Sequence, residues 1–273
     1  MTPNPVVLVT GATDGVGREV ARRLALSGAQ VLVHGRNRER GEALVGEVMA
    51  AGGQARFYGA DLAVQAEVRA LAEAVRRDHG RLDVLVNNAG IGTGAPGEGR
   101  RTTDDGIELR FAVNYLAGFL LTRLLLPLLR QSAPTRIVNV SSLGQQAIDF
   151  EDVMLTRGYS GGRAYCQSKL AQILFTADLA EELAGSGVTA NCLHPATYMN
   201  TTMVRTAGVP PASTVGEGAE AILRLILAPE LAAVSGRFFD GLREARPDPQ
   251  AADRHARDRL RALSWELTGS APA

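Results

Sequence analysis

The sequence predicts one α/β domain built around a doubly wound parallel β-sheet. Short apolar runs alternate with amphipathic stretches along most of the 273 residues. The apolar runs lack strict alternation of polar and apolar residues, which is typical of strands covered on both faces. Hydrophobic residues make up 45% of the chain, and no shift in composition marks a boundary between domains. We therefore expect residues 1–273 to form a single domain.

The expected strands and helices alternate along the chain. Six strands are expected, at Val6–Thr10, Gln30–Gly35, Ala55–Ala60, Val84–Asn87, Arg136–Val140 and Val188–Leu193. Helices are expected at Val16–Ser27, Arg38–Ala51, Val64–Asp78 and Gly162–Ala184, with a broken helical stretch over Asp104–Arg130. Such strand–helix–strand units place helices on both faces of a parallel sheet.

Two long segments interrupt this alternation, at 144–161 and 197–214. Both follow the carboxyl ends of expected strands, where open α/β sheets bind ligands. We expect them to be substrate loops. Tyr159, Tyr198, Met199 and Met203 lie in these segments and either line the substrate site or fill the core.

Composition and charge exclude several classes of protein. The 29 basic residues balance 29 acidic ones and form no block of like charge, so the surface of a nucleic-acid-binding protein is not expected. Two cysteines, Cys166 and Cys192, are too few for a disulfide framework, and the four histidines show no metal-binding spacing. His194 is interpreted as a structural histidine rather than a proton shuttle.

One stretch, Ala112–Leu129, is apolar enough to be considered as a membrane span. Asn114, Arg123 and Pro127 lie within it, and an arginine deep in a bilayer is costly, so a buried helix of a soluble protein is the better interpretation. Neither a secretory signal peptide nor a membrane anchor is recognisable, and we expect a cytoplasmic protein.

A glycine-rich turn follows the first expected strand and leads into a helix. Glycines at such a turn let the backbone approach a diphosphate, which then faces the positive end of the helix. We interpret the turn as the dinucleotide-binding site of a Rossmann-type fold rather than as an ordinary loop. The expected contacts are Gly11, Thr13, Asp14, Gly15, Val16 and Gly17.

The second expected strand ends at Gly35, and Arg36 follows it. A NAD site places a carboxylate here for the ribose 2′-hydroxyl, whereas an arginine suits the 2′-phosphate of NADP. Arg36 therefore favours NADP(H) over NAD(H), with Arg18 as a second possible contact. The alternative is that Arg36 is an ordinary solvated arginine.

Lys169 is the only lysine among the 29 basic residues, and it lies four residues after Tyr165. On a helix this spacing puts both side chains on one face. A free phenol has a pKa of about 10, so acid–base chemistry near neutrality needs it lowered by roughly 3 units, or about 4 kcal/mol. We expect the Lys169 ammonium to supply this stabilisation.

Five pieces of sequence occur in an order that resembles the short-chain dehydrogenase/reductase family: Thr10–Gly17, Asn87-Asn88-Ala89-Gly90, Asn114, Val140-Ser141-Ser142 and Tyr165-x-x-x-Lys169. The resemblance implies that Tyr165 is the acid in reduction and the base in oxidation, and that Ser142 binds the substrate carbonyl. Lys169 would hold the nicotinamide ribose, and Asn114 would anchor a water.

The resemblance also implies cofactor contacts. They are Asp61 and Leu62 beside the adenine, Asn87, Ala89 and Gly90 along the adenosine ribose, Tyr165 and Lys169 at the nicotinamide ribose, and Pro195 and Thr197 at the carboxamide. The chain departs from the family at Ala196, where glycine is usual, which affects the path of the loop that carries Thr197.

Within the family, Gly158-Tyr159-Ser160-Gly161 and Leu263–Gly269 are similar to the retinol-dehydrogenase-like branch. This resemblance implies a mainly hydrophobic ketone, aldehyde or alcohol as substrate. It also implies a homodimer or homotetramer assembled through helices around residues 109–130 and 163–184. Two alternatives remain: an NADP(H)-binding regulator or scaffold without turnover, and an epimerase or dehydratase of the same fold.

Overall fold

Eight strands form one sheet in the order β3-β2-β1-β4-β5-β6-β7-β8 in the computed structural model, which describes residues 4–269. The first seven strands run parallel, and β8 is antiparallel to β7. The strands are β1 (Val6–Val9), β2 (Gln30–Gly35), β3 (Gln54–Gly59), β4 (Val84–Asn87), β5 (Thr135–Val140), β6 (Val188–His194), β7 (Phe238–Asp240) and β8 (Arg243–Ala245).

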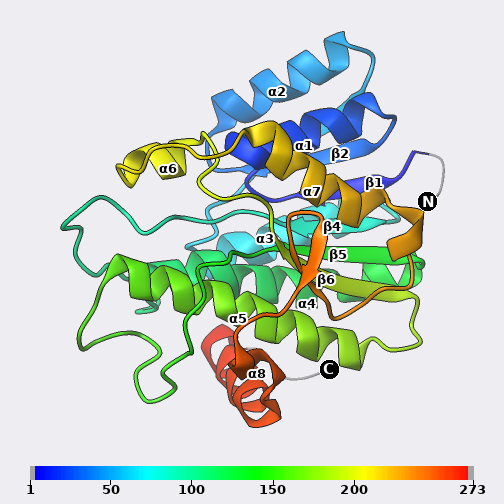
Figure 1. Cartoon of the computed structure of the whole chain (residues 1–273). Coiled ribbons are helices and arrows are strands. Elements are labelled where there is room, and N and C mark those ends of the chain that lie inside the picture. Colours follow the sequence, from blue (N-terminus) through cyan, green and yellow to red (C-terminus); the bar gives the residue numbers. More distant parts are fainter. Residues whose placement is uncertain (1–3, 270–273) are drawn as a thin grey trace.

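Helices cover both faces of the sheet (Figure 1). One face carries α1 (Gly15–Leu26), α2 (Arg38–Ala50) and α7 (Val215–Leu227), and the other carries α3 (Gln65–Asp78), α4 (Ala117–Gln131) and α5 (Gly161–Glu182). Two short or terminal helices, α6 (Thr202–Thr206) and α8 (Arg254–Thr268), complete the set together with single turns at Phe111–Leu116, Pro229–Leu231 and Pro249–Ala252. The predicted Rossmann-type, doubly wound sheet of a single domain is confirmed.

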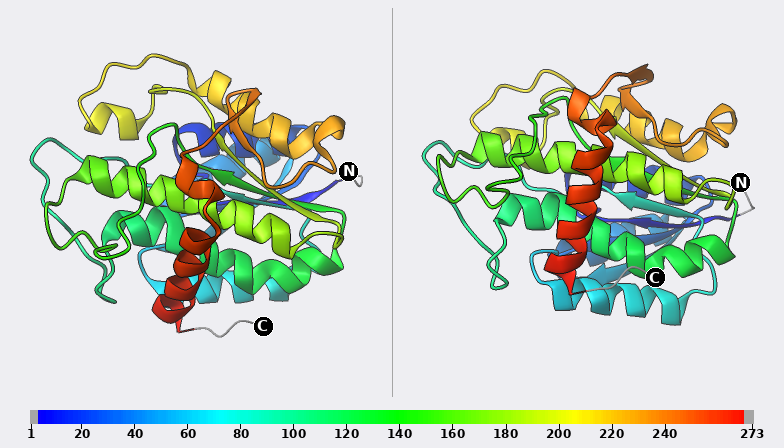
Figure 2. Two further views of the ribbon diagram at one scale, coloured as in Figure 1. Left: turned by 60° about the horizontal axis from the view of Figure 1, so that its bottom comes forward. Right: turned by 90° about the horizontal axis from the view of Figure 1, so that it is seen from below.

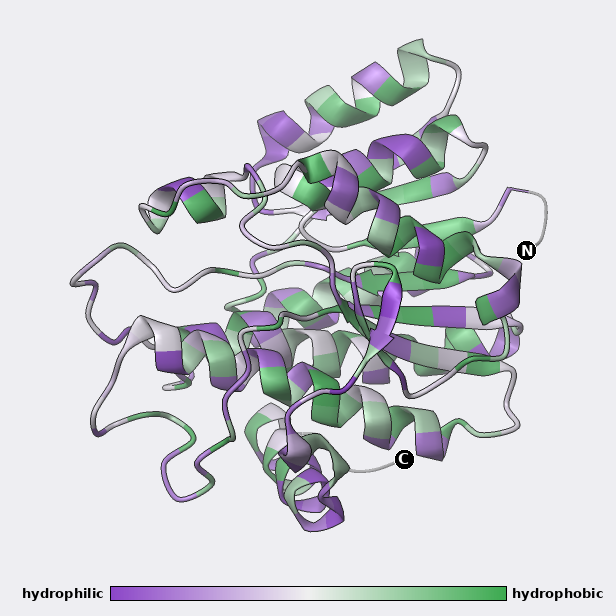
Figure 3. Ribbon diagram, viewed as in Figure 1, coloured by the Kyte–Doolittle hydropathy of each residue, from purple (hydrophilic) through white to green (hydrophobic). Residues whose placement is uncertain are grey.

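The burial of the strands explains why their sequences read as continuous apolar runs. All four residues of β1 are buried, with Val7 and Val9 in one core and Val6 and Leu8 in the other. Figure 3 shows the central strands as largely hydrophobic, whereas the helices carry polar residues on their outer surfaces. Alternate side chains of one strand therefore serve two cores.

The structure differs from the expected elements in three ways. It contains the helices α6, α7 and α8, which were not predicted. β7 and β8 were not predicted, because three residues each are too few to show a pattern. Pro127 lies inside α4 and does not end it. Leu126, Leu128 and Leu129 are buried around it, and this packing offsets the missing backbone hydrogen bond.

The C-terminal helix α8 lies across the outer surface of α5 and α4 (Figure 2). The rings of Phe119 and Trp265 meet edge to face at 5.0 Å, and Arg123 lies over Trp265 at 5.1 Å. Arg261 forms an ion pair with Asp178 of α5. The apolar and charged contacts together fasten α8 to the helical layer.

This position of α8 bears on the assembly that the family resemblance implied. The expected interface used helices around residues 109–130 and 163–184, and α8 covers part of their outer faces. Assembly through these helices would therefore have to include α8 or displace it.

Among residues 4–269, one helical stretch, Phe111–Gln131, is long and apolar enough to cross a membrane. Of its most apolar window, 72% is buried inside the protein. Core helices of soluble proteins can be equally long and apolar. The length and composition of this stretch are therefore only weak evidence for a membrane span.

Candidate active site

The glycine-rich turn between β1 and α1 packs directly against the loop that follows β4. Gly11 has φ +65°, and a Cβ atom there would lie 2.8 Å from the Cα of Ala89. A Cβ on Gly17 would lie 2.3 Å from both the Gly11 carbonyl oxygen and the Asn88 amide nitrogen. Only glycine fits at these two positions, so the turn packs tightly against the loop after β4 and against the start of α1, as a dinucleotide-binding turn requires.

The two loops are also joined by hydrogen bonds from Thr10 and Asn88. The Thr10 hydroxyl accepts from the backbone N–H of Asn88 at 2.9 Å and of Ala89 at 3.0 Å, and it donates to the Val86 carbonyl. The Asn88 amide donates to the Thr10 carbonyl at 2.8 Å. The motif Asn87–Gly90 thus holds the glycine turn in place as well as bordering it.

His34, at the end of β2, is a buried residue that the sequence analysis missed. Its Nδ1 accepts from the Gly11 N–H at 3.3 Å, and its Nε2 lies 3.1 Å from the Ala60 carbonyl oxygen. Since a carbonyl only accepts, Nε2 carries the proton and the ring is neutral. Burial lowers the pKa of His34 to about 4. One imidazole therefore links the glycine turn to the residue before Asp61.

The expected adenosine contacts cluster at the ends of β2 and β3. The Thr13 side chain lies over Gly35, where a Cβ would come within 2.4 Å of it. Arg36 is 67% exposed, with its guanidinium 3.8 Å from the Asp61 carboxylate. Leu62 is buried in the core beneath α3, so its side chain serves packing. The exposed groups here are Arg36 and Asp61.

The arginines near the start of α1 differ from the expectation. Arg18, expected as a second phosphate contact, forms an ion pair with Glu47 of α2. Arg40 instead reaches Asp14 at 3.4 Å, and Asp14 caps α1 by accepting from the Gly15 N–H. Arg40 is therefore the second basic group beside the glycine turn. The Asn37 side chain caps α2 by accepting from the Arg40 N–H, and this places Arg40 in the first turn of the helix.

The segment 197–214 folds back over the glycine turn. Ser213 donates to the Thr197 carbonyl, and the Ala212 N–H donates to the Tyr198 carbonyl, so its two arms are joined. A Cβ on Gly15 would lie 3.2 Å from the Thr201 methyl group. Val16 packs into the core on the α1 side of the sheet.

Pro195 and Thr197 lie where this segment leaves β6. Thr197 Oγ1 lies 3.0 Å from Nε2 of His194, which places His194 in a local hydrogen bond. Burial lowers the pKa of His194, with the Asp240 carboxylate acting in the opposite direction.

Tyr165 and Ser142 are brought together by α5 and the end of β5. A Cβ on Gly144 would lie 3.4 Å from the Ser142 hydroxyl and 3.5 Å from the Tyr165 ring, so the two flank one point of the backbone. Burial raises the pKa of Tyr165, and hydrogen bonding to Ser142 opposes that rise. The Ser142 oxygen also accepts from the Gly144 N–H at 3.0 Å.

Lys169 shares a helix face with Tyr165, but its contacts differ from the expectation. Its Nζ donates to the Val140 carbonyl at 2.8 Å and to the Gln172 side chain at 3.0 Å, and it lies 5.7 Å from the centre of the Tyr165 ring. Burial lowers the pKa of Lys169 to about 7. In the protein without a bound nucleotide, burial therefore decides the direction of the pKa shift of Tyr165, which is upward and not downward as expected.

Asn114 lies in a π-helical turn, Phe111–Leu116, directly before α4. Such turns frequently occur at functional sites. The Asn114 amide accepts from the Ile91 N–H at 2.8 Å and donates to the Ile91 carbonyl and to Ser168. A Cβ on Gly90 would lie 3.2 Å from Asn114 Oδ1 and 3.6 Å from Lys169 Nζ. Gly90 thus borders both polar groups.

Asn87 differs from its expected role in that its side chain faces the helical layer. It is buried and donates to Thr122 at 3.0 Å and to Asn139 at 2.8 Å. Only its backbone is left for contact with a bound nucleotide. A single sequence does not show which face of a strand end a side chain takes.

The segment 144–161 is held in place by the C-terminal part of the chain. Gln145 accepts from the Asp248 N–H at 2.7 Å, and Gln250 bonds both the N–H and the carbonyl of Ile148. Tyr159, one of the suggested pocket residues, has its hydroxyl bonded within the protein, and Met199 packs against Gly218. Tyr198 and Met203 remain exposed.

The comparison with protein families agrees with this geometry. The family described as short chain dehydrogenase matches residues 5–209 of the sequence. The chain belongs to this family. The resemblance drawn from the glycine turn and the Tyr165–Lys169 spacing is confirmed.

Relatives within the short-chain dehydrogenase family support the narrower resemblance to retinol dehydrogenases. Human retinol dehydrogenase 13 is 40% identical, over 98% of this chain and 85% of its own length. Human retinol dehydrogenase 12 is 37% identical, over 98% of this chain and 87% of its own length. Among solved structures, the NADP complex of Pseudomonas aeruginosa RhlG is 28% identical with a TM-score of 0.71, covering 88% of this chain and 97% of that one.

Proposed function

We propose that the protein is an NADP(H)-dependent oxidoreductase that transfers a hydride between the nicotinamide and a carbonyl, or the corresponding primary or secondary alcohol. The observation that carries the proposal is the convergence of Ser142 and Tyr165 at Gly144, after the end of β5. Lys169 lies one helical turn further along α5 and next to Gly90, in the loop that packs against the glycine turn. The cofactor, when bound, supplies the hydride in reduction and a positive nicotinamide ring in oxidation. The remaining chemistry falls to side chains of this chain.

Tyr165 is the group proposed to move the proton. In reduction its hydroxyl donates to the developing alkoxide, and in oxidation its oxygen takes the proton of the alcohol. Ser142 donates a hydrogen bond to the same substrate oxygen and holds it next to the phenol. Since burial raises the pKa of Tyr165, the phenol is protonated in neutral solution, as the reductive direction requires.

Lys169 and Asn114 are proposed to organise the surroundings of Tyr165. The Lys169 ammonium is placed to hold the nicotinamide ribose, next to Gly90. Asn114 fixes the loop that begins at Ile91 and would anchor a water for proton exchange. The fit of a dinucleotide is supported by Gly11 and Gly17, which allow the tight turn that leads from β1 into the N-terminus of α1.

NADP(H) is proposed over NAD(H) on the basis of two basic groups near the ends of β1 and β2. Arg36 is exposed at the end of β2, and Arg40 lies beside the cap of α1. A guanidinium fork suits the 2′-phosphate that distinguishes NADP. RhlG, which is 28% identical, was solved in complex with NADP.

The substrate is proposed to be a mainly hydrophobic small molecule. Leu143, Tyr198 and Met203 are large apolar side chains that remain exposed, next to Ser142 or within the segment 197–214. The relatives at 37–40% identity are retinol dehydrogenases, named for an apolar alcohol. We also propose a cytoplasmic location, which agrees with the burial of Phe111–Gln131.

The test is NADPH oxidation with a panel of apolar ketones and aldehydes. We expect turnover by the wild-type protein, its loss in Tyr165→Phe, and near-normal turnover in Tyr58→Phe, a matched control on the edge strand β3. Lys169→Arg should also be impaired, because Lys169 is enclosed and a guanidinium is too broad for its place. Undiminished turnover in both Tyr165→Phe and Lys169→Arg would rule out the mechanism.

Tight NADPH binding without turnover on a broad panel would favour the alternative, a cofactor-binding regulator. The presence of Ser142, Tyr165 and Lys169 together favours catalysis. Net oxidation of NADPH distinguishes a reductase from an epimerase, which returns its hydride to the substrate.

A further inference from the structure

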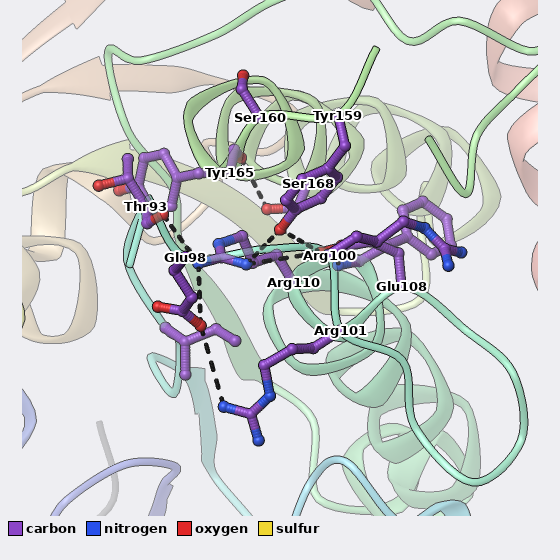
Figure 4. Close-up of polar contacts among 12 residues, drawn as sticks. Thr93, Glu98, Arg100, Arg101, Glu108, Arg110, Tyr159, Ser160, Tyr165 and Ser168 are labelled. Carbon is purple, nitrogen blue, oxygen red and sulfur yellow. Dashed lines mark hydrogen bonds and ion pairs between the residues drawn. The ribbon is translucent and has the colours of Figure 1, made fainter. Parts of the chain in front are cut away.

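A buried guanidinium joins two loops that border the candidate site. Arg110 precedes the π-helical turn and is 2% exposed. Its Nε donates to the Gly92 carbonyl and its Nη2 to the Thr93 carbonyl, both at 2.8 Å. Its Nη1 donates to the Tyr159 hydroxyl at 2.6 Å. Figure 4 shows Arg110 between the loop after β4 and the segment before α5.

Two carboxylates balance the charge of Arg110. Glu108 is 1% exposed and lies 3.7 Å from Nη1, and it accepts from the Tyr159 hydroxyl at 3.3 Å. Glu98 lies 3.8 Å from Nη2 and accepts from the Ala95 N–H. Buried ion pairs of this kind are often no more stabilising than apolar packing of the same volume. Stability alone therefore does not account for the network.

Both parts joined by Arg110 lead to the candidate catalytic groups. Asn114, one helical turn after Arg110, bonds both backbone groups of Ile91. Two side chains one turn apart on the same helical stretch therefore hold residues 91–93. A Cβ on Gly161, the first residue of α5, would lie 1.9 Å from the Thr93 carbonyl oxygen. The start of α5, four residues before Tyr165, thus rests directly on the loop that Arg110 holds.

A second contact joins the same two segments further from the site. The Arg100 side chain donates to the Met154 carbonyl at 2.8 Å, and the Glu108 N–H contacts the Met154 sulfur at 3.4 Å. The loop after β4 is therefore tied to the segment 144–161 at two points.

We propose that Arg110, acting with Tyr159, is a positioning residue that fixes the start of α5, and hence Tyr165, against the loop 91–93. The effect of Arg110 on catalysis rests on the function proposed above, whereas the contacts by which it holds α5 against the loop 91–93 do not. A displacement of a reacting group by about 1 Å costs roughly 100-fold in rate. Loosening this link should therefore lower the rate of the chemical step more than it weakens cofactor binding.

The test compares Arg110→Gln and Tyr159→Phe with a matched control, Arg101→Gln, whose side chain is exposed and pairs only loosely with Glu98 at 3.9 Å. We expect kcat to fall about 10- to 100-fold in Arg110→Gln, and less in Tyr159→Phe, with the cofactor KM within about twofold of wild type. The double variant should be no slower than Arg110→Gln. The control should match the wild type.

Amide hydrogen exchange supplies a readout that does not depend on turnover. Residues 91–94 and 158–163 should exchange faster together in both variants and remain protected in the control. Unchanged exchange in these two segments, or a kcat within twofold of wild type in folded Arg110→Gln, would overturn the proposal. If Arg110→Gln does not fold, Tyr159→Phe tests the proposal instead, since it removes only the hydroxyl that Arg110 contacts. If the wild type has no turnover, the proposed function fails, and amide hydrogen exchange alone tests whether Arg110 holds the two segments together.

Discussion

The Lys169 ammonium lies 5.7 Å from the centre of the Tyr165 ring, yet it donates its hydrogen bonds to the Val140 carbonyl and the Gln172 side chain. Burial lowers the pKa of Lys169 to about 7 and raises that of Tyr165. The two side chains are thus neighbours whose proton equilibria are set mainly by their enclosure. A bound nucleotide that approaches both would alter each equilibrium.

The lowered pKa of Lys169 makes stability depend on pH in a defined direction. Well above pH 10.5, the ordinary pKa of lysine, the side chain is neutral in both the folded and the unfolded states. As the pH falls toward 7, the unfolded chain takes up a proton that the folded protein does not, so the folded protein loses stability. Between pH 9.5 and 7.5 this loss amounts to about 2–3 kcal/mol.

Urea unfolding of the wild type and of Lys169→Met at these two pH values measures the effect. The methionine has the length of the lysine stem and no titrating group. The free energy of unfolding should therefore fall by about 2–3 kcal/mol more in the wild type than in Lys169→Met. Equal pH dependence in the two proteins would contradict the prediction.

His34 should affect cofactor binding without touching the cofactor. Its ring holds the Gly11 N–H on one side and the Ala60 carbonyl on the other. In His34→Ala we expect the dissociation constant for NADPH to rise about tenfold, the effect of losing one to two net hydrogen bonds, while kcat at saturating cofactor stays within about twofold. Fluorescence titration with NADPH measures the change.

His79→Ala is the control for His34→Ala, because His79 is only half-buried and bonds Tyr58 at the far end of α3. It should bind NADPH like the wild type. Cofactor affinity that is unchanged in His34→Ala would show that the imidazole serves the fold only.

Arg36→Asp should change the preference between cofactors. The substitution removes a cation and places a carboxylate where the 2′-phosphate is expected, so the KM for NADPH should rise by about 10- to 100-fold. The KM for NADH, which has no 2′-phosphate, should change by less than about threefold. Steady-state rates with both cofactors measure the ratio.

Arg38→Asp is the matched control, since Arg38 is exposed at the start of α2, two residues after Arg36, and pairs with Glu42 at 2.9 Å. It should leave the ratio of the two KM values near that of the wild type. Equal losses for NADPH and NADH in Arg36→Asp would argue against NADP preference.

Local features of the site were predictable because short-range geometry determines them. The spacing of Tyr165 and Lys169 places both on one face of any α-helix, and the turn at Gly11 and Gly17 needs residues without a side chain wherever a strand leads tightly into a helix. Six of the eight strands were found from their apolar runs, since a strand buried on both faces shows continuous hydrophobicity.

Contacts between segments far apart in the chain were decided by the tertiary structure. The sequence does not show which partners Arg18 and Arg40 take. Only the packing of α2 beside α1 places Arg18 in an ion pair with Glu47, and Arg40 in an ion pair with Asp14. The same holds for the link between His34 and Gly11 and for the burial that raises the pKa of Tyr165.

The sequence by itself therefore determined the fold class through its periodicity, and the shared helix face of Tyr165 and Lys169 through their spacing. The family, and the candidate roles of Ser142 and Asn114, came from the resemblance of its ordered motifs to a known family. The tertiary structure alone decided which partner each polar side chain takes and which charges are enclosed, as for Arg110. Hydrogen bonds and desolvation depend on distances in space, and these are set only when the sheet and its two layers of helices have packed.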